Sequence, residues 1–233
     1  MSEDTPSANA EIAAALAAVR REIAAAAAGA GRTPEAVALV AVSKTQPVES
    51  LEAALAAGQR VFGENRVQES AAKWPALRAR HPDLELHLVG PLQTNKVREA
   101  VALFDVVETV DRPKLAMALA AELARAPKPL RCYIEINTGG EAQKAGVAPA
   151  DLEALLALCR GDCKLPVTGL MCIPPQDEDP ALHFALLADL ARRHDLFEIS
   201  MGMSGDYPLA VRFGATHVRV GTAIFGARAV SAP

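Results

Sequence analysis

The amino-acid sequence predicts an α/β fold, a single (β/α)8 barrel of the TIM type with one additional helix before the first strand. Eight short runs rich in valine, isoleucine and leucine alternate with longer, alanine-rich segments, and no linker rich in proline, glycine or serine divides the chain. The runs are apolar almost throughout, which is typical of parallel strands buried on both faces. An open doubly wound sheet is the alternative, although residues 42–47 do not form the G-x-G-x-x-G turn of dinucleotide-binding sheets.

The expected strands follow from these runs. They are residues 37–42, 60–62, 86–89, 106–109, 132–136, 167–171, 197–200 and 217–220. A helix from about residue 8 to 28 precedes the first strand, and residues 1–7 are expected to be disordered.

Capping signals mark several of the helices between the strands. Asp111 and Asp179 each stand just ahead of an early-turn proline, an arrangement that begins a helix. Thr94 is expected to cap the helix that follows it, and Gly58 marks the end of the helix before it.

Length and composition limit the classes of protein that this chain can belong to. Its 233 residues, 51% of them hydrophobic, are expected to form one domain over 1–233. Lys+Arg 24 against Asp+Glu 28 gives a net charge of −4, so no basic surplus is present to bind nucleic acid through phosphate contacts. Aromatic residues are only 4%, which also argues against stacking on single-stranded bases.

The sequence also indicates where the protein works. The first four residues are acidic rather than basic, unlike a secretory signal, and charged residues interrupt the alanine-rich stretch 13–30, so no membrane span is predicted. The cysteines at 132, 159, 163 and 172 do not have recognisable zinc spacing and are expected to be free thiols. We therefore expect a cytoplasmic protein without a bound metal, and a monomer whose first helix packs on its own barrel.

Lys44 is the first candidate functional residue. In a barrel of this type functional groups gather at the carboxyl ends of the strands, and Lys44 directly follows the first predicted strand. Partial desolvation lowers a lysine pKa and frees the amine to attack a carbonyl group. The alternative is an ordinary surface lysine beyond a strand end.

A candidate anion site follows the last two predicted strands. Ser204 opens the segment after the seventh strand, and Gly221 and Thr222 follow the eighth. Loops at these two positions are the recurring phosphate site of the fold, because backbone N–H groups at a helix start attract anions. A plain helix cap at Ser204 and a tight turn at Gly221 are the structural alternatives. Together with Lys44, these residues predict a phosphorylated carbonyl ligand.

Arg219 lies in the last predicted strand, two residues before Gly221. If its side chain points inward, it lies between lysine and phosphate and can face a pyridine nitrogen, which it keeps unprotonated because a guanidinium only donates hydrogen bonds. The alternative is an outward arginine paired with a helix carboxylate.

Several longer motifs add a resemblance to a known family. They are AVSKT (41–45), FGENRVQE (62–69), GPLQTNK (90–96), GLM (169–171), SMGMSGD (200–206) and VRVGTAIFG (218–226). These motifs resemble the YggS/PROSC family of pyridoxal 5′-phosphate homeostasis proteins, over about residues 37–228.

The resemblance implies a barrel like the N-terminal domain of alanine racemase, with pyridoxal 5′-phosphate as the cofactor. It implies that Lys44 forms a Schiff base with the cofactor, and that Arg219 approaches the pyridine nitrogen. Ser204, Gly221 and Thr222 would hold the phosphate. Asn65 and Asn95 would line the pocket. The position of Lys96 beside the mouth, apart from the resemblance, allows it to hold a second cofactor molecule or to aid dissociation, but a solvated lysine on a helix face is favoured.

Alanine racemase itself carries a second domain that supplies a tyrosine base, and the present sequence ends at Pro233. Its two tyrosines, Tyr133 and Tyr207, are not expected to stand across the cofactor from Lys44, and racemisation needs a base on each face of the carbanion. A non-catalytic protein that carries and buffers the cofactor, and hands it to apo-enzymes, is therefore expected. A racemase-like enzyme is the alternative, and a Schiff-base enzyme acting on a sugar phosphate is a third hypothesis.

Overall fold

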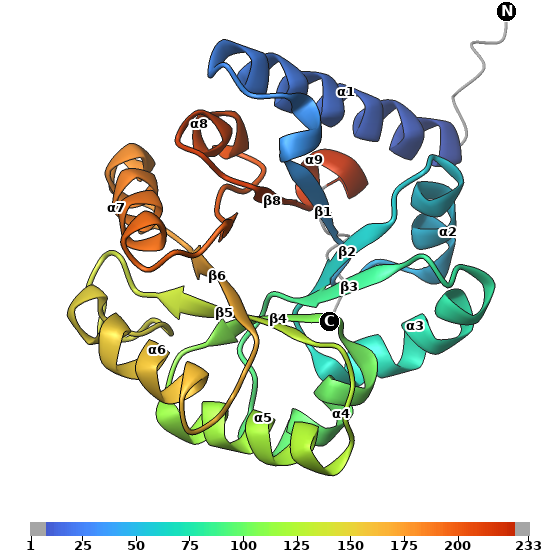
Figure 1. The fold of residues 1–233 in the computed structure, drawn as a ribbon. Helices are drawn as coiled ribbons and strands as arrows, with labels where there is room; N and C mark the ends of the chain where they lie inside the picture. Colours follow the sequence, from blue (N-terminus) through green and yellow to red (C-terminus); the bar gives the residue numbers. More distant parts are fainter. Residues whose placement is uncertain (1–7, 227–233) are drawn as a thin grey trace, which may run out of the picture.

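The computed structural model describes residues 8–226, which form a closed barrel of eight parallel strands in chain order (Figure 1). The strands are β1 (Ala38–Val42), β2 (Val61–Glu64), β3 (Glu85–Leu88), β4 (Val106–Val110), β5 (Arg131–Ile136), β6 (Val167–Cys172), β7 (Glu198–Ser200) and β8 (His217–Val220). The predicted (β/α)8 barrel is confirmed, and each strand begins and ends within two residues of its predicted bounds. Residues 1–7, for which disorder was expected, lie outside the described residues.

A helix follows every strand of the barrel. The helices are α1 (Ala8–Gly29), α2 (Val48–Ala56), α3 (Val67–Arg80), α4 (Val97–Leu103), α5 (Pro113–Arg125), α6 (Leu152–Arg160), α7 (Pro180–Arg193), α8 (Tyr207–Arg212) and α9 (Thr222–Phe225), with 3-10 turns η1 (Pro34–Ala36), η2 (Thr94–Lys96) and η3 (Pro149–Asp151). They surround the strands on the outside (Figure 1).

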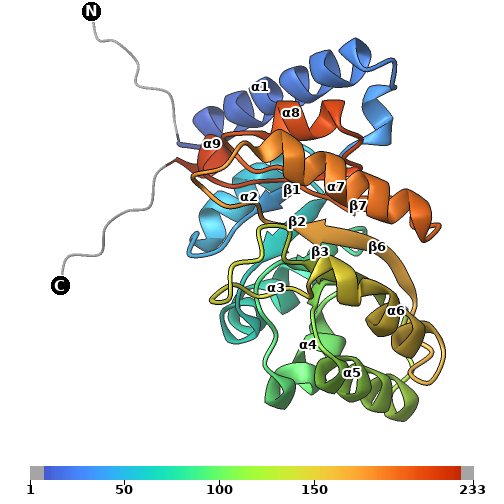
Figure 2. The same cartoon turned by 90° about the vertical axis from the view of Figure 1, so that its left-hand side faces the viewer.

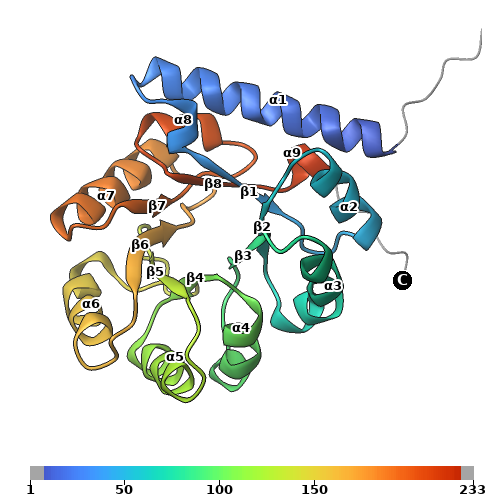
Figure 3. The ribbon, with the colours of Figure 1, turned by 45° about the vertical axis from the view of Figure 1, so that its right-hand side comes forward.

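The predicted additional helix is α1. It packs outside α2, α8 and α9, next to the junction of the first and last strands (Figures 2 and 3). Leu16 and Ala27 of this helix are fully buried. The Arg20 guanidinium donates hydrogen bonds to the carbonyl of Ala57 (3.1 Å) and to Oε1 of Gln59 (2.9 Å). Among the described residues, this helix and all the others are too short or too polar to cross a lipid bilayer.

Pairing of β1 with β8 closes the barrel. Ala38 lies opposite His217 and Val40 lies opposite Arg219 in this parallel pair. Because parallel strands end on the same side, the segments that follow β1 and β8 emerge together. Residues separated by most of the chain thus become neighbours.

The capping predictions are partly wrong. Asp179 caps α7, because its carboxylate accepts a hydrogen bond from the N–H of Ala181 (3.0 Å). Thr94 instead begins the turn η2, and α4 starts only at Val97 without a side-chain cap. Asp111 does not cap α5, because its carboxylate pairs with the guanidinium of Arg112.

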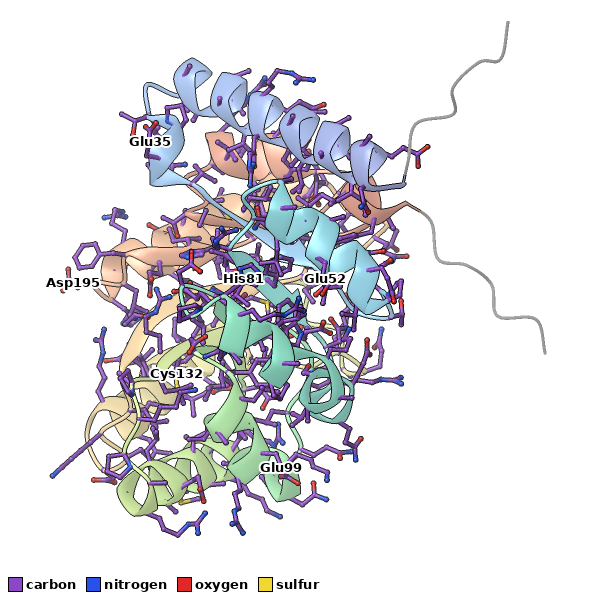
Figure 4. All side chains as sticks on the ribbon, turned by 90° about the vertical axis from the view of Figure 1, so that its right-hand side faces the viewer. Glu35, Glu52, His81, Glu99, Cys132 and Asp195 are labelled. Carbon is purple, nitrogen blue, oxygen red and sulfur yellow. The ribbon has the colours of Figure 1, made fainter. Side chains whose placement is uncertain are left out.

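The apolar core fills the layer between the strands and the helices. Trp74 of α3 is buried against Phe62 of β2, with ring centroids 4.9 Å apart, and its indole N–H donates to Oε1 of Glu64 (3.0 Å). Cys132 of β5 is also buried in this layer, whereas Glu99 lies at the outer surface of α4 (Figure 4). The interior of the barrel, in contrast, contains charged side chains.

Gly169 of β6 tests the packing of the barrel. A Cβ atom there would lie 2.3 Å from the carbonyl oxygen of Glu198 in the next strand. We expect Gly169→Ala to lower the free energy of unfolding by about 1–3 kcal/mol, because the two strands must move apart. Urea unfolding measures the change. The control is Gly29→Ala, where the added Cβ meets open space and helix propensity favours alanine; if both variants are equally stable, the close approach of β6 to β7 is wrong.

Candidate functional site

The loops at the carboxyl ends of the strands enclose a cavity of about 320 Å³. Its lining includes six of the seven residues predicted from the sequence: Lys44, Asn65, Ser204, Arg219, Gly221 and Thr222. The seventh, Asn95, is exposed in the turn η2 and does not line this cavity. Closure of the barrel is the reason for the convergence, since the lysine follows β1 and the last three residues belong to β8 or the segment after it.

The backbone on both sides of Lys44 is held by side chains of neighbouring elements. Lys44 itself is half-buried, two residues beyond β1. On one side, the Ser43 hydroxyl donates to Oε1 of Glu64 (2.8 Å), and Nζ of Lys73 donates to the Ser43 carbonyl (3.1 Å). On the other side, the N–H of Thr45 donates to Oε1 of Glu69 (2.6 Å). We call Glu64, Glu69 and Lys73 the lysine clamp.

The clamp stabilises an unfavourable backbone conformation. Thr45 has φ +63°, in the left-handed region, which costs a β-branched residue about 1–3 kcal/mol. Lys73 Nζ lies 2.9 Å from Glu64 and 2.8 Å from Glu69, and it joins the two carboxylates. Partial burial raises the pKa of Glu69, but the hydrogen bonds from Lys73 and from the Thr45 N–H outweigh it and the pKa lies below its usual range. Glu69 is thus ionised at neutral pH.

Ser204 and the start of α9 form a second part of the cavity wall. The Ser204 hydroxyl accepts hydrogen bonds from the N–H groups of Gly221 (3.3 Å) and Ala223 (3.5 Å). The alternative that Ser204 caps the following helix is wrong, because α8 begins only at Tyr207. Two backbone amides therefore converge on one hydroxyl oxygen, and the hydroxyl proton remains to be donated to the oxygen of an anion.

Glycine is required in the turn that carries Ser204. Gly202 has φ +90°, and a Cβ atom there would lie 2.5 Å from Cβ of Ala210. Only glycine adopts this conformation without strain and allows so close an approach. This turn therefore packs closely against α8.

Arg219 points into the barrel, so the alternative of an outward arginine is wrong. Its side chain is 97% buried; one Nη donates to the Ser200 hydroxyl (2.7 Å) and the other to the carbonyl of Cys172 (2.8 Å). The Ser200 hydroxyl in turn donates to Oε2 of Glu108 (2.6 Å). The guanidinium is held in place from inside the barrel while it lines the cavity.

The fixed arginine belongs to a charged network that sequence reasoning missed. Nδ1 of His87 lies 2.6 Å from Glu108 and Nε2 lies 2.7 Å from Glu85. Ionised carboxylates only accept hydrogen bonds, so both ring nitrogens must carry protons and His87 is an imidazolium. Burial lowers the pKa of His87, but the two carboxylates outweigh it and raise the pKa to about 9. The His217 ring, 5.7 Å away, has its pKa lowered to about 4 by burial and by the charge of His87.

The sequence contains one signal of this network: polar residues alternate with apolar residues along some of the strands. His87, Glu108, Ser200 and Arg219 occupy inward positions of their strands, where barrels of this type usually carry branched apolar residues. Polar residues inside otherwise apolar runs therefore marked the barrel interior, but their partners lie on strands far apart in the sequence.

Besides Lys44, the described residues that line the cavity include no aspartate, glutamate, histidine, cysteine or tyrosine. Tyr133 lies in the barrel interior, 3.5 Å from Nε2 of His217, and the Tyr207 hydroxyl donates to Glu22 of α1 (2.6 Å). Within residues 8–226 no group of three or more histidine, cysteine, aspartate or glutamate side chains could hold a metal ion.

Comparisons with known proteins identify what the chain is similar to. Residues 14–229 match the family model described as alanine racemase, N-terminal domain. A pyridoxal phosphate homeostasis protein of Vibrio alginolyticus is 46% identical over 208 residues, which cover 85% of this chain and 89% of the relative. A pyridoxal phosphate homeostasis protein of Escherichia coli is 40% identical over 232 residues, which cover 94% of this chain and 97% of the relative.

Solved structures show the same pattern. PipY of Synechococcus elongatus, in a structure with pyridoxal phosphate bound, has a TM-score of 0.78 and 39% identity and covers 92% of this chain and 100% of its own. A histidine racemase of Leuconostoc mesenteroides has a TM-score of 0.67 at 18% identity, and covers 94% of this chain but 58% of its own. The second likeness shows a shared fold alone.

The ionised state of His87 predicts how stability depends on pH. Its pKa is about 9 in the folded protein and about 6.5 when unfolded, so its stabilisation is complete below about pH 6.5 and is lost as pH rises through 9. We expect the free energy of unfolding to fall over this range, and His87→Gln to remove that fall. Urea unfolding at several pH values measures it. A His87→Gln profile parallel to wild type would contradict the assignment; the control His81→Gln, near the surface (Figure 4), should retain the fall.

The lysine clamp predicts how tightly the backbone at Thr45 is held. In Glu69→Ala the Thr45 amide loses its acceptor, and we expect its hydrogen exchange to be faster by about tenfold. Glu69→Gln keeps an acceptor oxygen but loses the ion pair with Lys73, and should give a smaller increase. Exposed Glu49 provides the control variant Glu49→Ala. Unchanged exchange at Thr45 in Glu69→Ala would disprove the clamp.

Proposed function

This chain belongs to the alanine racemase N-terminal domain family and, within it, to the pyridoxal phosphate homeostasis proteins, and we propose that it binds pyridoxal 5′-phosphate, carries it and buffers its free concentration. One observation carries the proposal: a single cavity is lined by Lys44, by the hydroxyl and backbone groups of Ser204, Gly221 and Thr222, and by the buried Arg219. These groups match the aldehyde, the phosphate and the ring nitrogen of the cofactor.

Each residue has a proposed task in holding the cofactor. When bound, pyridoxal phosphate supplies an aldehyde that condenses with a primary amine and a ring that withdraws electrons. Lys44 provides the amine, and the lysine clamp keeps it aimed into the cavity. Ser204, Gly221 and Thr222 bind phosphate oxygens. Arg219 donates toward the ring nitrogen and keeps it unprotonated, because a guanidinium has no proton to release at neutral pH. Asn65 lines the same cavity.

The lining of the cavity supports a carrier over a racemase. Exchange of an α-proton with inversion needs one base on each face of the substrate. Lys44 can serve one face, but the described lining residues offer no second base. Burial, followed by the charge of Asp111, raises the pKa of Glu135 to about 7, but Glu135 does not line the cavity. We therefore propose a non-catalytic protein.

The proposal also covers the domain organisation, the oligomeric state and the cellular location of the protein. Residues 1–233 would form one cofactor-binding domain that acts as a monomer and hands the cofactor to apo-enzymes. We place it in the cytoplasm on the ground that Cys132, Cys159 and Cys172 are buried free thiols, which fits a reducing compartment.

Replacement of Lys44 tests the cofactor site. Purified protein given pyridoxal phosphate should gain the visible absorbance of the bound cofactor, and Lys44→Ala should lose it while the control Lys114→Ala keeps it. Borohydride reduction followed by peptide mapping should locate the modification on Lys44. Identical visible spectra for wild type and Lys44→Ala would overturn the assignment.

The non-catalytic part of the proposal has its own test. Loaded protein incubated with L-alanine in deuterated water should show no rapid α-deuteration, because the described residues that line the cavity offer no second base besides Lys44. Proton NMR of the alanine and chiral chromatography follow the reaction. Rapid deuteration with inversion would establish the racemase alternative instead.

A further inference from the structure

A second cavity, of about 510 Å³, adjoins the first at the same end of the barrel. Polar and cationic side chains dominate its lining: Asn65, Arg66, Gln68, Gln93, Lys96 and Arg112. We propose that it is an anion site that binds the phosphate group of a small phosphorylated ligand. The proposal rests on the function above only in its choice of ligand, since the cation cluster is a separate observation.

The cations of this site come from three consecutive loops. Arg66 follows β2, Lys96 lies in η2 after β3, and Arg112 follows β4. No described residue with a carboxylate lines the cavity, although the chain as a whole has a net charge of −4. Glu69, Glu99 and Asp111 lie near these cations but outside the lining, so an anion in the cavity would meet the cations rather than the carboxylates.

The three cations differ in how far they are already neutralised. Arg112 pairs with Asp111 and donates to the carbonyl of Leu92 (2.9 Å), which orients its guanidinium. Lys96 lies 3.2 Å from Glu99, which stands at the outer surface of α4 (Figure 4). Within residues 8–226, no hydrogen bond holds the exposed side chain of Arg66. All three cations thus have a carboxylate neighbour, because the charge of Arg66 acts on Glu69. Arg66 differs in that its side chain makes no hydrogen bond within the described residues, so it can turn toward an incoming anion.

The neutral lining residues indicate which anion fits. Asn65, Gln68 and Gln93 each offer an amide N–H₂ group beside the cations. A phosphate monoester carries close to two negative charges and three acceptor oxygens, so it can engage two guanidinium groups and amide donors together. A single carboxylate has two oxygens and one charge, and would leave part of this donor set unused.

Asn65 connects the second cavity to the first, because it lines both. A phosphorylated B6 compound held in the first cavity would therefore lie beside the cavity that Arg66 and Lys96 line. The phosphate held in the second cavity could come from such a compound or from inorganic phosphate, and the experiment below separates these sources.

The test first fills the cofactor cavity. Protein loaded with pyridoxal phosphate and reduced with borohydride is titrated by calorimetry, at low salt, with pyridoxine 5′-phosphate, which has no aldehyde, and separately with inorganic phosphate. We expect one further site for either probe, weakened by salt. Equal binding of both probes means that only the phosphate is held, and tighter binding of pyridoxine 5′-phosphate means that the ring is held too; both support the site.

Charge removal locates the site. Arg66→Gln combined with Lys96→Gln should weaken the second binding event about tenfold or more, and the matched control, Arg98→Gln with Lys114→Gln, should leave it unchanged. Thermal unfolding checks that both double variants fold, and Arg66→Gln alone serves if the first does not. No further binding, or equal binding in both double variants, overturns the proposal. Failure of the proposed function would give a different result from failure of the second site, because borohydride reduction would then leave no adduct on Lys44.

Discussion

Closure of the barrel by the parallel pairing of β1 with β8 is the constraint on which the site depends. It sets Val40 opposite Arg219 and brings the segments after both strands to one rim. Lys44 and Gly221 are thereby placed around one cavity although 177 positions separate them in the sequence. The segment after β1 supplies the lysine, and the segment after β8 supplies groups suited to a phosphate. A cavity that combines the two, as a ligand with an aldehyde and a phosphate requires, therefore exists only in the closed barrel.

Charged and polar side chains inside the barrel hold Arg219 of this site in place. Burying ionised groups costs several kcal/mol for each ion unless partners compensate for the lost water. Here Glu85, His87 and Glu108 alternate in charge, and Ser200 links Glu108 to Arg219. An apolar interior would avoid the cost of desolvation but would provide no acceptor for a buried guanidinium. The charged interior and the fixed arginine are therefore one structural feature.

The lysine end is rigid for a different reason. An unfavourable left-handed conformation at Thr45 persists because Glu69 accepts its N–H, and Lys73 ties Glu69 to Glu64. Strain held in this way is common where a functional group must be presented in one direction. The second cavity, with Arg66 and Lys96, adjoins the first at Asn65. The structure thus combines a fixed interior with a cationic rim.

By itself, the sequence determined the features that are local. Continuous apolar runs predicted the eight strands, and the segments that follow β1, β7 and β8 supplied Lys44, Ser204 and Gly221 as candidates, because functional groups of a parallel barrel gather at the carboxyl ends of its strands. The tertiary structure alone decided how residues far apart pair: the clamp of Lys73 on Ser43, the charged contact of His87 with Glu108, and the exclusion of Asn95 from the cavity. The caps expected at Thr94 and Asp111 failed for local reasons instead: Thr94 belongs to the turn η2, and the adjacent guanidinium of Arg112 pairs with Asp111. The contacts between distant residues depend on which strand lies opposite and which side chain faces inward, and closure of the barrel fixes both only once the whole chain has folded.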